Sequence, residues 1–125
     1  PGVVPEIAVG SITQELNRDT PYNAQVTVAV ESLASGWAAP ERAKWLSEAI
    51  ESASQKHFGK PVQFMGEGGT IPFMHMLGEK YPKAGFMVTG LLGPGSNAHG
   101  PNEFLHLPTF FKLTACVSDV ISKFK

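Results

Sequence analysis

Cysteine, charge imbalance and long apolar runs are all scarce in this chain of 125 residues. Its one cysteine, Cys116, excludes a disulfide within the chain and fits a reducing compartment. Ten basic residues against eleven acidic ones leave a net charge of -1. That balance argues against nucleic acid or a membrane as partner, because both attract a basic surface. No apolar run is long enough to span a bilayer and no secretory signal opens the sequence, so we expect a cytoplasmic protein.

The composition is that of a globular protein. Hydrophobic residues make up 42% and charged residues 17% of the chain, which is too apolar for a disordered polymer. The length suits one domain with its own core. Glycine is unevenly placed, since ten of the 13 glycines lie between Gly59 and Gly100. Glycine-rich turns occur where the backbone bends sharply or approaches a ligand, so this stretch is the first functional indication.

Apolar periodicity predicts an α/β fold. Spacings of three and four residues favour helices over 4–17, 40–58, 71–81 and 109–125. Alternating or short apolar runs favour strands over 24–31, 62–65 and 86–89. We expect Pro40 in the first helical turn and Gly59 as a helix stop. Strands that alternate with helices in the second half are typical of a parallel sheet with crossover helices.

Two glycine-rich loops each follow an expected strand and precede an expected helix, which places them at the ligand-binding edge of an α/β sheet. The first, at 66–70, holds Gly68, Gly69 and Thr70. Its backbone N–H groups and the threonine hydroxyl could bind an anion or carboxylate, or the loop could be only a tight turn. No lysine follows its last glycine, so it is not a Walker loop.

The second loop, at 93–103, presents His99 on a backbone stiffened by glycine and proline. Such a histidine suits a metal ligand or an acid–base group, with Asn102 and Glu103 as partners that orient its ring, although a plain surface histidine is the alternative. The other histidines indicate less: His57 suits a helix C-terminus, and His75 a partly buried site. His106 suits a helix start or a pocket wall.

Together, GEGGTIPF (66–73) and GPGSNAHGPNEFLHLP (93–108) resemble the C-terminal part of the co-catalytic zinc exopeptidases. That family includes carnosine dipeptidases, bacterial glutamate carboxypeptidase, acetylornithine deacetylase and succinyl-diaminopimelate desuccinylase. PYNAQVTV, Trp37 and LTACV extend the resemblance over nearly the whole chain. It implies that residues 1–39 end a lid and dimerisation domain. Residues 40–125 would then form the C-terminal part of a catalytic domain, so that an α-β lid end continues into the strands and helices of a catalytic α/β sheet.

The resemblance also implies roles for individual residues. His99 would be the last ligand of one of two zinc ions, which activate a water against a peptide or N-acyl amino acid. Gly68, Gly69 and Thr70 would border that substrate. The family's other ligands and its catalytic glutamate belong to a long N-terminal segment without counterpart here. We therefore expect an isolated chain that is inactive and binds zinc weakly, in a parent enzyme that is a homodimer through its lid.

Two other functions are compatible with the residues alone. The chain could be a non-catalytic dimerisation or binding module that uses the segment 24–31 and the helix 40–58 as its contact surface. It could also be an anion-binding α/β domain that uses the loop 66–70.

Overall fold

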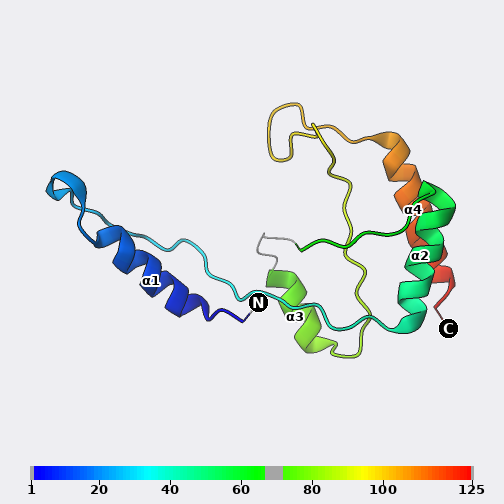
Figure 1. Ribbon diagram of the computed structural model, residues 1–125, viewed down its shortest axis with the longest axis horizontal. Helices are drawn as coiled ribbons and strands as arrows, with labels where there is room; N and C mark the ends of the chain where they lie inside the picture. Colours follow the sequence, from blue (N-terminus) through cyan, green and yellow to red (C-terminus); the bar gives the residue numbers. More distant parts are fainter. Residues whose placement is uncertain (1, 67–71, 125) are drawn as a thin grey trace. The chain divides into compact units, whose positions relative to one another are not determined.

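A computed structural model describes residues 2–66 and 72–124, and over these ranges the ordered elements are helices (Figure 1). In chain order they are α1 (Pro5–Asn17), the short 3-10 helix η1 (Pro21–Asn23), α2 (Lys44–Phe58), α3 (Pro72–Lys80) and α4 (Leu107–Ser122). The chain divides into two compact units: the described residues of Pro1–Ala39 with Glu67–Ala84, and those of Pro40–Gly66 with Gly85–Lys125. No helix in the described ranges is long and apolar enough to cross a membrane.

The expected α/β fold is wrong, because the described part of the chain contains no strand. The segments 24–31, 62–65 and 86–89 lie instead in irregular stretches between helices. A helix makes its hydrogen bonds within itself, whereas a strand needs a neighbour in register. The Val62 N–H donates to the Glu51 carboxylate at 3.1 Å, and Val62 and Met87 pack their side chains against helices. An alternating or short apolar run therefore does not by itself predict a strand, because strand formation also needs a neighbouring strand.

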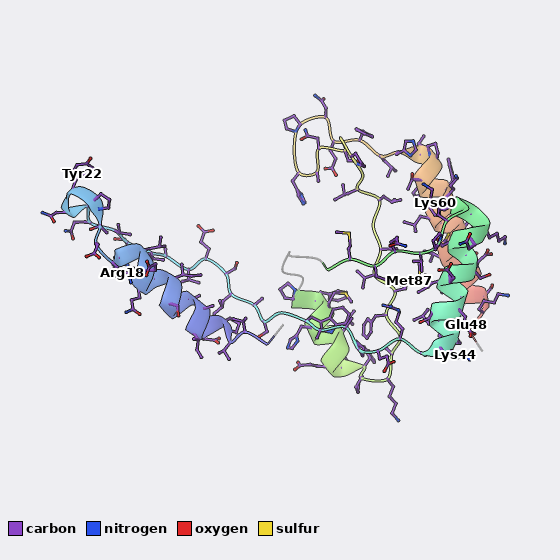
Figure 2. All side chains as sticks on the ribbon, viewed as in Figure 1. Arg18, Tyr22, Lys44, Glu48, Lys60 and Met87 are labelled. Atoms are coloured by element: carbon purple, nitrogen blue, oxygen red, sulfur yellow. The ribbon has the colours of Figure 1, made fainter. Side chains whose placement is uncertain are left out.

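The four expected helices are confirmed, with shifts at their ends. The second begins at Lys44, so Pro40 lies outside it. Gly59 closes α2 in the left-handed conformation, with φ of 67°, and its N–H donates to the Gln55 carbonyl, as expected of a glycine cap. On α2, Lys44 Nζ lies 3.7 Å from Glu48 Oε1 one turn later, a pairing of neighbours that supports the helix modestly (Figure 2).

Helices α2 and α4 pack against each other and form the core of the second unit. Its buried members are small or medium apolar side chains: Leu46, Ala49, Ile50, Ala53, Cys116 and Val120. Cys116 is buried in this pair, whereas Ile121 on α4 and Phe124 just beyond its end are exposed. The rings of Trp45 and Phe124 are in tilted contact, with centroids 5.5 Å apart. Trp45 is therefore a packing residue of this unit.

The first unit has little burial. No residue of α1 is buried, although the helix carries Ile7, Ile12 and Leu16. On α3, a Cβ added at Gly78 would lie 2.6 Å from the Trp37 indole nitrogen, so glycine at this position lets the ring approach the helix. Trp37 is therefore a packing residue of this unit.

Candidate functional site

The loop that carries His99 is anchored at its base by Ser96. This serine is 4% exposed, and among the described residues it is the polar residue that is buried. Its N–H donates to the Gly93 carbonyl at 3.1 Å, and its hydroxyl accepts from the Gly93 N–H at 3.0 Å. Its carbonyl accepts from the Phe104 N–H at 3.2 Å. These bonds tie the two ends of the loop together, so the residues between them form a closed turn.

The tip of the loop is fixed by Asn97. Its side-chain Nδ2 donates to the Pro101 carbonyl, and its own carbonyl accepts from the Gly100 N–H at 2.9 Å. A Cβ at Gly100 would come within 2.7 Å of the Asn97 amide, so the close approach requires glycine. Asn97, His99 and Asn102 all have left-handed backbones, with φ between 54° and 60°. Asparagine tolerates that region better than most residues, and His99 is held there by its neighbours.

His99 is exposed at this tip. Its backbone N–H lies 3.3 Å from Glu103 Oε2 and donates to it, so Glu103 positions the main chain of His99. Glu103 is thus a partner of His99, but through the backbone and not through the ring as expected. The described hydrogen bonds give Asn102 no such role. Sequence reasoning missed Asn97 and Ser96, whose positions beside the Gly-Pro-Gly turn were the available signal.

The described residues do not by themselves form a metal site, since no three His, Cys, Asp or Glu among them gather around one point. A zinc site needs at least three protein ligands. His99 fits such a site only as one ligand, with an accessible imidazole on a stiff loop. The predicted substrate residues Gly68, Gly69 and Thr70 lie outside the described residues.

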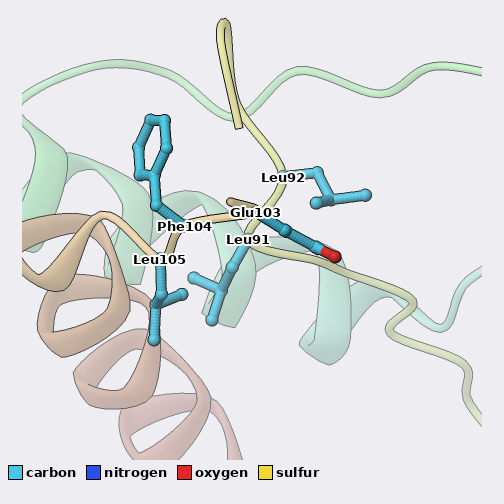
Figure 3. Close-up of a pocket in the computed structure, with 5 residues that line it drawn as sticks. All are labelled: Leu91, Leu92, Glu103, Phe104 and Leu105. Atoms are coloured by element: carbon cyan, nitrogen blue, oxygen red, sulfur yellow. The ribbon is translucent and has the colours of Figure 1, made fainter. Parts of the chain in front are cut away.

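Beside this loop is a cavity of about 370 Å³, where the stretches entering and leaving the loop meet (Figure 3). Its lining is apolar apart from one carboxylate: Leu91, Leu92, Glu103, Phe104 and Leu105. Because Glu103 also holds His99, the cavity and the candidate ligand share a residue. Sequence reasoning did not find this cavity, since it depends on two stretches that are separated by the loop.

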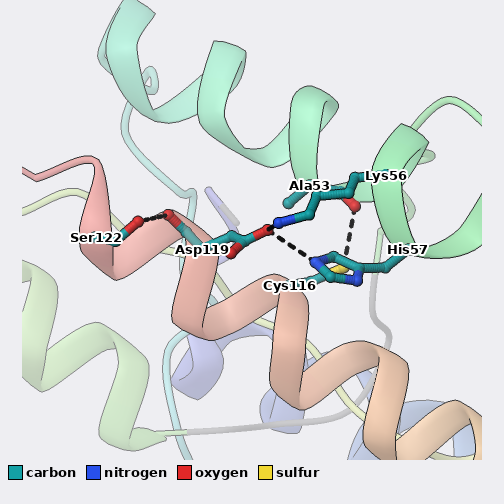
Figure 4. A network of polar contacts seen from close by, with 6 residues as sticks. All are labelled: Ala53, Lys56, His57, Cys116, Asp119 and Ser122. Carbon is teal, nitrogen blue, oxygen red and sulfur yellow. Dashed lines mark hydrogen bonds and ion pairs between the residues drawn. The ribbon is translucent and has the colours of Figure 1, made fainter.

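A second polar cluster joins α2 to α4 through Asp119 (Figure 4). Lys56 Nζ lies 2.7 Å and His57 Nε2 2.8 Å from the same Asp119 oxygen, and both donate to it because a carboxylate only accepts. The hydrogen bond from Lys56, and then that from His57, lower the pKa of the Asp119 carboxyl. His57 therefore ties two helices together, which is more than the helix-end role expected of it.

The remaining chemical groups have structural roles. Burial raises the pKa of the Cys116 thiol, with a smaller contribution from the Asp119 carboxylate, and its Sγ donates to the Ala53 carbonyl at 3.3 Å. A buried thiol of this kind is a poor nucleophile. His106 precedes α4 and places its Nδ1 2.8 Å from Thr109 Oγ1, which settles its position at a helix start. His75 is partly buried, as expected, and lies 3.4 Å from Glu79.

A comparison with models of protein families gives a match. The family described as peptidase family M20/M25/M40 matches residues 2–123, which is nearly the whole chain. The match includes both the loop of His99 and the α2–α4 pair. No curated protein matches the chain.

Proposed function

This chain belongs to peptidase family M20/M25/M40, and on that premise we propose that it is the C-terminal portion of a zinc-dependent enzyme that hydrolyses dipeptides or N-acyl amino acids. Family membership supports the class, a metallopeptidase-type hydrolase. The zinc, the substrate and a cytoplasmic location are parts of the proposal.

The observation that carries the proposal is the presentation of His99. Its imidazole is exposed at the tip of a loop whose base and tip are both closed by hydrogen bonds. A metal ligand held this way loses little conformational freedom on binding, which is what a precise site requires.

One ligand is too few for the two zinc ions of the proposed site. The other ligands and the glutamate that takes a proton from water would come from an N-terminal segment of the same enzyme. Bound zinc would polarise the scissile carbonyl and lower the pKa of a bound water. In this chain His99 would hold the metal, Glu103 would fix the His99 backbone, and Gly68, Gly69 and Thr70 would bind the substrate.

The first experiment is hydrolysis of a panel of dipeptides and N-acyl amino acids by the full-length parent polypeptide, with and without chelator. We expect turnover that chelator abolishes and added zinc restores. Turnover that chelator leaves unchanged would refute the zinc mechanism. The 125-residue chain assayed alone should be inactive, because one imidazole cannot replace the three or more ligands of a zinc site.

The second experiment replaces His99 in the parent enzyme. Asparagine is the better substitute than alanine because it tolerates the left-handed backbone at this position. We expect His99→Asn to abolish turnover and to lower the zinc content measured by atomic spectroscopy. The melting temperature of the metal-free protein should stay the same, because the side chain is exposed. Full zinc content with near-normal turnover would show that the loop is only structural.

A second candidate function, a dimerisation module, is favoured by α1. Its Ile12 and Leu16, four residues apart on one face, are 57% and 53% exposed, and exposed apolar side chains on one helix face are typical of a protein interface. The contact surface expected from the sequence consists of 24–31 and 40–58. It is less suited to dimerisation, because the apolar face of α2 is already packed against α4. Sedimentation of the parent protein and of Ile12→Ser/Leu16→Ser separates the cases. A dimer that the substitutions dissociate supports the module, and a monomer in both excludes it.

A further inference from the structure

The cavity beside the His99 loop is a feature that the proposed chemistry uses only through Glu103, which also holds the His99 backbone. Three leucines and Phe104 form its walls; Leu92, Phe104 and Leu105 are 65%, 50% and 48% exposed, and Leu91 is partly buried. Contact with an apolar ligand would remove this surface from water, which is favourable in proportion to the area covered. The cavity is therefore suited to an aliphatic group.

The size of the cavity limits what it can hold. At about 370 Å³ it lies near the lower end of the range of about 300–1,000 Å³ found for ligand pockets. Its lining residue Glu103 is exposed to solvent. A single amino-acid side chain fits this description better than a larger ligand.

The charge of the cavity limits the ligand further. Glu103 is the one acidic residue in the stretch 84–111, and that stretch contains no lysine or arginine. Within the described ranges Glu103 makes no ion pair, and its carboxylate accepts a hydrogen bond from the N–H of His99. A carboxylate has capacity for several hydrogen bonds, so one N–H leaves room for another donor. A cationic group would complete it, whereas a second carboxylate would be repelled.

We propose that this cavity is a specificity pocket that selects a substrate residue with an aliphatic stem and a terminal cation, such as lysine. The leucines and Phe104 would contact the methylene groups, and Glu103 would accept from the ammonium, since lysine buries its stem on apolar surface while its charged end stays at a polar rim. This inference rests on the proposed function, because the pocket shares Glu103 with the loop of the proposed metal ligand.

The experiment compares lysine with norleucine, which keeps the aliphatic stem and removes the charge. Dipeptides of alanine with each residue, in either order, are hydrolysed by the full-length zinc-loaded enzyme, and kcat/KM is measured for each. We expect the lysine peptides to be favoured about two- to fivefold, which is the range for an ion pair at an exposed carboxylate. Glutamate peptides should be the poorest of the series.

The deciding variant is Glu103→Gln, whose amide oxygen can still accept from the His99 N–H but carries no charge. Its ratio of kcat/KM for lysine over norleucine should fall to about one. Glu41→Gln is the matched control, because it removes an exposed carboxylate from the same unit and should leave that ratio unchanged.

The outcomes separate this inference from the proposed function. Chelator-sensitive hydrolysis with a ratio near one, or a ratio that Glu103→Gln does not change, overturns the pocket and leaves the proposed function intact. Absence of hydrolysis defeats the proposed function, and the pocket is then decided by calorimetric titration of the same protein with N-acetyl-lysine amide and N-acetyl-norleucine amide. Tighter binding of the lysine ligand that depends on Glu103 supports the pocket, and equal or absent binding overturns it.

Discussion

Truncation of Leu46 tests whether the α2–α4 pair is the main source of stability in the second unit. Leu46 is 3% exposed in a cluster that has only six buried residues, all on these two helices. It is also tightly surrounded, since a Cβ at Gly85 would lie 3.0 Å from its Cδ2 atom. Leu46→Ala therefore removes packed atoms and leaves a gap that the neighbouring backbone cannot fill without moving.

The expected cost of Leu46→Ala follows from this environment. Buried leucine to alanine changes cost about 2–5 kcal/mol, and a thin cluster near the surface relaxes more than a deep core. We therefore expect a loss of about 2–3 kcal/mol in the free energy of unfolding. Because a domain has only about 5–15 kcal/mol in total, this loss would lower the denaturant midpoint clearly.

The matched control is Leu107→Ala on α4, which makes the same chemical change at a side chain that is 56% exposed. Its effect should stay within about 0.5 kcal/mol. Both variants and the unchanged 125-residue chain are unfolded in urea and followed by circular dichroism at the helix band. Equal losses for the two variants would refute the reasoning, since burial would then not decide the cost.

Two further predictions concern charge and glycine. Because the pKa of Asp119 is lowered in the folded chain, its stabilising effect is present at neutral pH and is lost as the pH falls below about 4. Melting temperatures between about pH 3 and 7 should show a smaller acid loss for Asp119→Asn than for the unchanged chain; parallel curves would contradict this. A Cβ at Gly10 on α1 would meet nothing within 4 Å, so Gly10→Ala should raise helix stability by about 0.5–1 kcal/mol. Gly78→Ala should instead lower stability, because its Cβ would displace Trp37. Thermal unfolding compares the two variants, and a gain in stability at both positions would contradict the close contact between Gly78 and Trp37.

The functional loop shows how far a sequence pattern reaches. Glycine and proline around His99 predicted a stiff loop, and in the structure hydrogen bonds close its base and its tip. The pattern did not reveal that Ser96 closes the base or that Asn97 closes the tip, because a side chain in a turn can bond to several nearby backbone groups. It assigned Glu103 to the His99 ring, whereas the carboxylate binds the backbone. Composition predicted stiffness, and only the fold showed which atoms provide it.

Local order in this protein was determined by the sequence and tertiary pairing was not. The positions of the four helices follow from apolar spacing and from a glycine stop, since a helix satisfies its own hydrogen bonds over four residues. The segment 24–31 has an equally regular apolar pattern, yet it forms no strand in the described chain. A strand needs hydrogen bonds to a neighbouring strand, and the local sequence pattern does not supply that neighbour. The Lys56–Asp119 and His57–Asp119 contacts join residues 63 and 62 positions apart, and the cavity joins both ends of a loop. Such contacts exist only once helices and loops have packed, so tertiary structure alone decided them.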